Sequence, residues 1–214
     1  MAASKSKLWL ELLILYCCLP LLVLFDLFPF PPLLLLFSVC VYALFICRAY
    51  LKDWNAKPKF VWQRDKRFLL AIGWRFGLLM GLIAGVVLAF LPENLFSLVK
   101  ESPDLVVALA IFYPLVSVVP QEFLYRAYFF HRYSSIFPSP VTLCLVSAGL
   151  FSYLHIIYAN WIALSMSFAG GLLFSYTYLR ARSFFLVCLE HSLYGLWIFV
   201  VGLGDYFYIN IFAA

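Results

Sequence analysis

Charged residues are scarce in this sequence. Asp, Glu, Lys and Arg make up 12% of the 214 residues, whereas a soluble domain has about 25%. Hydrophobic residues make up 66% and aromatic residues 20%. This composition excludes an ordinary globular domain and predicts a polytopic membrane protein, which we expect to be an all-α bundle of transmembrane helices.

Other features that would indicate a function are also missing. The six cysteines lie within apolar runs without metal-ligand spacing, which predicts buried small side chains. No soluble domain, linker or internal repeat is visible, so residues 1–214 are interpreted as a single transmembrane domain. No small-residue cleavage site follows the first apolar run, which is therefore expected to be a retained anchor. The net charge of +5 must be judged by position, and no nucleic-acid partner is expected.

Seven apolar runs, the second of them short, predict about seven transmembrane helices. The runs are Leu8–Phe25, Leu33–Cys47, Phe68–Phe90, Asp104–Arg132, Pro140–Ile157, Trp161–Leu179 and Phe184–Leu203. Between the second and third runs, the basic segment Arg48–Arg67 is expected to hold an interfacial helix anchored by aromatic residues. With a cytoplasmic N-terminus, all of the fifteen Lys and Arg residues except Lys100 and Arg75 fall on the inner side, which predicts an N-in orientation.

The fourth run contains a polar cluster, Gln121, Glu122 and Arg126, immediately after Pro120. A charged side chain in hydrocarbon is costly, so such residues normally face a protein interior or a water-filled cavity. The proline frees a backbone carbonyl and kinks the helix, as suits a helix that lines a cavity. Glu122 and Arg126 are four residues apart and can neutralise each other. They form either a structural ion pair or part of a catalytic site.

Two other runs carry His155, Glu190 and His191. Convergence would reduce the cost of burying these polar groups, so we predict that Glu122, His155 and His191 line one cavity at mid-membrane depth. A carboxylate with two histidines can activate water and stabilise an oxyanion, or it can bind zinc. The helical His-Glu-x-x-His pattern is absent, so neither a metal nor another cofactor is expected.

Two charged residues near the ends of their runs receive simpler interpretations. Arg75 is expected to extend its side chain to the nearby membrane surface, although pairing with an acid in the bundle is an alternative. Glu11, in the first turn of its run, is expected to be solvated.

Three short motifs together resemble the CAAX-protease and bacteriocin-processing (CPBP) family. Gln121-Glu122-Phe-Leu-Tyr-Arg126, Phe151-Ser-Tyr-Leu-His155 and His191-Ser-Leu-Tyr-Gly195 are similar to the family's Glu-Glu-x-x-x-Arg, Phe-x-x-x-His and His-x-x-x-Asn. Their order and spacing match over roughly residues 70–205. The resemblance implies an intramembrane glutamic endopeptidase that needs no metal. Its expected partners are the lipid bilayer and a membrane-embedded peptide or lipid-anchored protein substrate, and its expected location is the bacterial inner (plasma) membrane.

Two positions depart from the family pattern. Gln121 occupies the first glutamate position and cannot accept a proton from water, and Gly195 replaces the asparagine that would assist the oxyanion. Either other residues have rebuilt the site or hydrolysis has been lost. In the second case the chain would bind a peptide or partner, as an immunity or sorting factor does. A small proton-coupled transporter is a third alternative, which the missing repeat disfavours.

We hypothesise that Glu190 supplies the acid–base function lost at position 121. No cation lies near Glu190 in the sequence, and burial without a cation would make it a stronger base. Glu122 and Arg126 would then serve as its scaffold. The predicted catalytic set is Glu122, Arg126, His155, Glu190 and His191.

Overall fold

The computed structural model describes residues 4–47 and 62–208. All secondary structure in these ranges is helical, of the α, π or 3-10 type. None of the described residues forms a strand, which confirms the predicted all-α class. Large apolar side chains are strongly exposed along the helices, including Trp74 at 76% and Phe90 at 78%. Such exposed apolar surfaces are favourable in contact with lipid and unfavourable in contact with water.

Within residues 4–47 and 62–208, six helical segments are long and apolar enough to cross a membrane, so the chain is an integral multi-pass membrane protein. They are Lys5–Leu24, Asp65–Phe90, Pro103–Ile136, Pro140–Tyr158, Trp161–Ala181 and Phe184–Val201. The expected second span corresponds to a shorter apolar helix, Pro32–Ile46. The count of seven spans and the N-in orientation stay predictions. The predicted interfacial helix falls mainly on residues 48–61, which lie outside the described residues.

The chain forms two compact units. The first unit contains residues 1–57, 120–176 and 209–214, and the second contains residues 58–119 and 177–208. Helix α11 (Trp161–Ala181) begins in the first unit and ends in the second.

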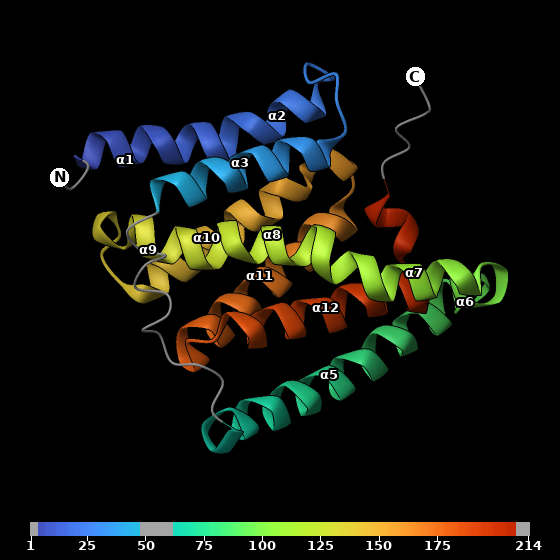
Figure 1. Ribbon diagram of the computed structural model, residues 1–214. Coiled ribbons are helices and arrows are strands. Elements are labelled where there is room, and N and C mark those ends of the chain that lie inside the picture. The colour runs from blue at the N-terminus through green and yellow to red at the C-terminus, as the bar shows by residue number, and fades with distance from the viewer. Residues whose placement is uncertain (1–3, 48–61, 209–214) are drawn as a thin grey trace. The chain divides into compact units, whose positions relative to one another are not determined.

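The first unit begins with one rod of helix that turns back into α3, as Figure 1 shows in blue. Its central side chain is Tyr16, which is 2% exposed and packs edge-to-face on Tyr125, Phe129 and Tyr133. The elements of this unit, besides most of α11, are α1 (Lys5–Leu12), η1 (Leu13–Cys18), α2 (Leu19–Leu24), α3 (Pro32–Ile46), α8 (Val119–Glu122), η4 (Phe123–Tyr128), α9 (Phe129–Tyr133), η5 (Ser134–Ile136), α10 (Pro140–Leu154) and η6 (His155–Tyr158).

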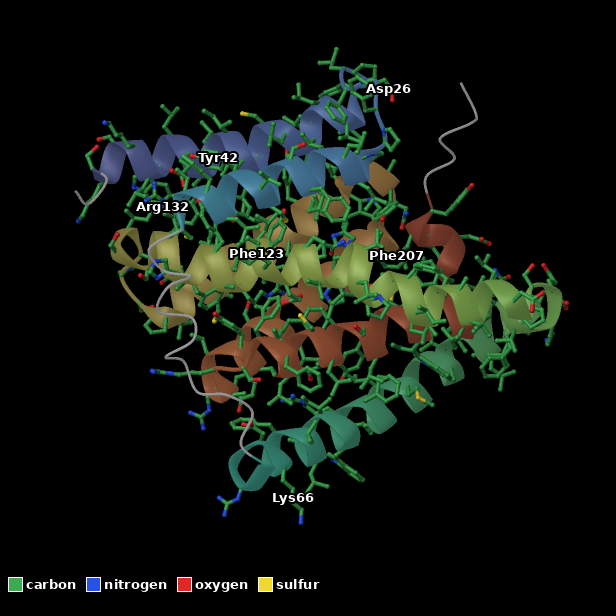
Figure 2. All side chains as sticks on the ribbon, viewed as in Figure 1. Asp26, Tyr42, Lys66, Phe123, Arg132 and Phe207 are labelled. Atoms are coloured by element: carbon green, nitrogen blue, oxygen red, sulfur yellow. The ribbon has the colours of Figure 1, made fainter. Side chains whose placement is uncertain are left out.

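Glu11 is not solvated, and the expectation that it would be is wrong. Its carboxylate accepts two hydrogen bonds from Arg132, at 2.7 and 3.0 Å, and one each from the hydroxyls of Tyr128 (2.6 Å) and Tyr133 (2.9 Å). Packing of α1 beside the end of α9 brings these residues together. In Figure 2, Arg132 and Asp26 mark opposite ends of this unit.

Replacing Glu11 by Ala is expected to destabilise the chain. The substitution removes the acceptor of four hydrogen bonds from three buried or half-buried side chains, and we expect a loss of about 2 kcal/mol in the free energy of unfolding. The measurement is the thermal transition in detergent, with Glu93→Ala, at an exposed loop acid, as the matched control. An unchanged transition in Glu11→Ala would contradict the stabilising role of this cluster.

The second unit is organised around α12 (Phe184–Val201), which packs against α5 (Trp62–Phe90), α6 (Ser97–Glu101), α7 (Pro103–Tyr113) and the π-helical segment η3 (Pro114–Val118). Two short 3-10 turns complete it, η2 (Pro92–Asn94) and η7 (Gly204–Phe207). In Figure 2, Lys66 and Phe207 lie at opposite ends of this unit.

Local sequence features explain where α12 begins and where it ends. The Ser183 side chain accepts a hydrogen bond from the Leu186 backbone amide and caps the start of the helix. Gly202 ends the helix at a φ of 103°, and a Cβ there would collide with the Asn94 carbonyl. Glycine is therefore required at this end both by conformation and by space.

Candidate functional site

The first unit contains the predicted Glu122–Arg126 pair. Both side chains are 0% exposed, and Arg126 Nε lies 3.2 Å from Glu122 Oε2. Arg126 also donates a hydrogen bond from Nη2 to the Gly171 carbonyl oxygen at 3.1 Å. Its guanidinium also lies 4.6 Å from the ring centre of Phe151 and 5.5 Å from that of Phe174. The pairing inferred from four-residue spacing is confirmed, and the cation is also held by aromatic faces.

The helix that carries this pair is irregular, as the prolines predicted. After α8 it continues as the π-helical segment η4, in which backbone carbonyls are displaced from their usual partners. Side chains from other helices supply donors. The Tyr16 hydroxyl donates to the Leu124 carbonyl at 2.8 Å, and the Ser147 hydroxyl donates to the Tyr125 carbonyl at 2.7 Å. These bonds stabilise an irregular backbone within an apolar unit.

His155 lies at the start of the 3-10 turn η6 and is 8% exposed. Its Nδ1 is 2.7 Å from the Phe151 carbonyl oxygen, which can only accept a hydrogen bond. Nδ1 therefore carries the proton, and in the neutral ring the lone pair is on Nε2. The ring packs edge-to-face on Phe151 with a centroid distance of 4.8 Å. His155 is thus held in one orientation with a basic nitrogen opposite its anchored side.

The second unit contains Glu190, and two sequence-based expectations fail there. Arg75 Nη2 donates to Glu190 Oε1 at 2.8 Å and to Thr177 Oγ1 at 3.0 Å. The expectation that Arg75 would extend to the surface is wrong, because packing of α5 on α12 offers it a buried carboxylate. The premise that Glu190 has no nearby cation is wrong for the same reason. The argument that isolation makes Glu190 a stronger base no longer holds.

His191, the next residue of α12, is 5% exposed and contacts Tyr113. The Tyr113 hydroxyl oxygen lies 3.3 Å from His191 Nε2, and the two rings meet edge-to-face. Sequence reasoning missed Tyr113 and Thr177, because neither belongs to a motif and both lie far from their partners in the chain. Only the tertiary fold reveals these contacts.

A comparison with protein families bears directly on these residues. The model of the family described as "Type II CAAX prenyl endopeptidase Rce1-like" matches residues 103–197. This match confirms the resemblance to the CPBP family that the three motifs indicated, over residues 103–197. All five predicted catalytic residues lie within the matched segment, whereas Arg75 precedes it. No curated protein and no solved structure matches the chain.

The positions that resemble the CPBP signature are distributed over both units. Glu122, Arg126 and His155 belong to the first unit, and Glu190 and His191 belong to the second. The convergence of Glu122, His155 and His191 in one cavity stays a prediction. Among residues 4–47 and 62–208, no group of three or more His, Cys, Asp and Glu side chains could hold a metal ion. Metal independence likewise stays a prediction.

Proposed function

We propose that the chain is an intramembrane endopeptidase that hydrolyses a peptide bond in a membrane-bound peptide or protein tail. The observation that carries the proposal is the fully buried Glu122–Arg126 pair, within the segment that matches a CAAX-type protease family. A carboxylate buried in an apolar bundle is costly, and a role in activating water accounts for its presence.

Glu122 is the carboxylate that best suits the role of general base. The cation beside it, Arg126, divides its interactions among the carboxylate, the Gly171 carbonyl and two aromatic rings. Glu190, in contrast, is bonded to Arg75 at 2.8 Å. A carboxylate that accepts a direct, charge-assisted hydrogen bond is less available to take a proton from water. We therefore assign water activation to Glu122, and we assign to Glu190 a positioning role beside His191.

The proposed reaction uses three side chains. Glu122 takes a proton from a water molecule while the water oxygen bonds to the scissile carbonyl carbon, and His155 Nε2 orients this water. His191 donates a hydrogen bond to the oxyanion that forms. As the carbon–nitrogen bond breaks, the proton on Glu122 passes to the departing amine nitrogen. The products are a carboxyl group and a free amine, and no metal takes part.

The substrate proposed here is a lipid-anchored protein tail, and the proposed location is a bacterial inner (plasma) membrane. The name of the matching family refers to prenylated CAAX tails. Acidic and basic groups buried among apolar helices suit a substrate that reaches the site from within the bilayer.

The direct test is cleavage of a fluorescent CAAX peptide by the full-length chain in lipid nanodiscs. We expect cleavage of the farnesylated peptide, with slower cleavage of the same peptide lacking the lipid. We also expect the rate to survive chelation of divalent metals, because proton transfer by side chains accounts for the chemistry. Stoichiometric zinc that is lost together with activity on chelation would refute metal independence, and the absence of any cleavage would refute the proposed function.

A non-catalytic function is the second candidate, and Gln121 favours it. This position holds a glutamate in the family motif, and an amide cannot accept a proton from water. In that case the chain would bind a membrane peptide or partner without hydrolysing it. Tight binding of the same fluorescent peptide without cleavage would support this candidate.

A further inference from the structure

Gly195 creates a space that a tyrosine side chain fills. A Cβ placed on Gly195 would overlap the Tyr113 hydroxyl oxygen and lie only 2.5 Å from Tyr113 Cζ. No residue with a side chain fits at position 195 while Tyr113 stays in place. The tyrosine and a side chain at residue 195 are therefore mutually exclusive occupants of one space.

The tyrosine in this space is held in a defined orientation. Its ring packs edge-to-face on Phe199, with centroids 5.8 Å apart, and on His191, with centroids 6.2 Å apart. Tyr113 is the last residue of α7, and Pro114 begins η3, so the side chain projects from a change in helix type. The hydroxyl is thereby fixed 3.3 Å from His191 Nε2.

We propose that the Tyr113 hydroxyl is the second hydrogen-bond donor to the substrate carbonyl oxygen, beside His191. This inference rests on the proposed hydrolytic function. A tyrosine hydroxyl both donates and accepts, so its oxygen can share the His191 Nε2–H with the oxyanion in a three-centre hydrogen bond while its own proton turns to the oxyanion. Gly195 removes the asparagine of the family motif, and Tyr113 supplies a donor from another helix into the same space.

The test compares two tyrosine-to-phenylalanine variants of the full-length chain in nanodiscs, with the farnesylated CAAX peptide as substrate. Tyr113→Phe keeps the ring and removes only the hydroxyl. We expect its kcat to fall about 100-fold with little change in KM, because an oxyanion donor acts mainly in the transition state. Tyr133→Phe is the control, since it removes a buried hydroxyl from the Glu11 cluster and should lower thermal stability but not kcat. A wild-type kcat in Tyr113→Phe overturns the proposal.

A second, independent experiment exchanges the side chains at positions 113 and 195 that can fill this space. Gly195→Asn alone should lose stability and activity, because its side chain overlaps Tyr113. The double variant Tyr113→Ala/Gly195→Asn puts an amide donor into the emptied space. Its turnover should exceed that of Tyr113→Ala alone and that of Gly195→Asn alone. A double variant that shows a cooperative thermal transition but is no more active than Gly195→Asn overturns the exchange.

Peptide binding separates failure of this inference from failure of the proposed function. If the wild-type chain binds the peptide without cleaving it, the hydrolytic function fails. A donor to the bound carbonyl then predicts that Tyr113→Phe raises Kd several-fold, by about the value of one hydrogen bond. An unchanged Kd in that case overturns the role of Tyr113 as well.

Discussion

Replacing Glu122 by Gln is expected to reduce the cleavage rate of the farnesylated peptide by about 10²- to 10⁴-fold, the range for loss of a general base. Glutamine keeps the size of the side chain and an oxygen that can accept from Arg126, but it cannot take a proton from water. The measurement is kcat in nanodiscs, with protein abundance matched by quantitative blotting.

Glu190→Gln is the matched comparison, because it makes the same chemical change in a second fully buried carboxylate. We expect a much smaller loss of kcat, since Glu190 takes no proton in the proposed reaction. Gln121→Glu should retain activity, because it restores the carboxylate of the family motif. If Glu190→Gln is inactive while Glu122→Gln cleaves normally, the base is Glu190 and the assignment of roles is reversed.

Replacing Arg126 by Ala is expected to lower stability and abundance as well as activity. The substitution leaves the carboxylate of Glu122 buried without its cation, and breaking a buried pair in this way costs about 3–5 kcal/mol. It also removes the guanidinium from the faces of Phe151 and Phe174. The measurements are the thermal transition in detergent and the steady-state level of the protein in membranes.

Two further substitutions give this prediction its controls. Arg75→Ala removes a cation from the other buried glutamate, but the Arg75 side chain is 26% exposed, so solvent access should reduce the loss. Arg126→Lys keeps the charge and loses the planar group, and it should be intermediate in stability. Normal abundance and normal activity in Arg126→Ala would show that the ion pair does not stabilise the chain.

The contacts that the sequence predicted correctly are local ones. Spacing of four residues on one helix put Glu122 beside Arg126, and the ranges of the last three helices follow directly from apolar runs bounded by Pro140, Trp161 and Phe184. Proline and helical periodicity act within a few residues, so their effects can be read from a single chain.

The contacts that the sequence missed join distant segments. Arg75 and Glu190 are 115 positions apart, and Glu11 and Arg132 are 121 apart. The local sequence around each of these residues does not indicate which helices pack against each other. A buried charge requires a partner, but the identity of that partner depends on tertiary packing.

The π-helical segment η4 determines the rotational phase of the helix on either side of it. A π turn accommodates roughly one residue more than an α turn, and one residue corresponds to about 100° of rotation. Compared with an uninterrupted α-helix, η4 therefore changes the direction of Arg132 relative to that of Glu122 by about that angle. With η4 in between, Glu122 faces Arg126 in the interior while Arg132 reaches Glu11. The extra residue thus sets the direction in which the terminal arginine leaves the helix, toward Glu11, while Glu122 keeps its partner in the interior.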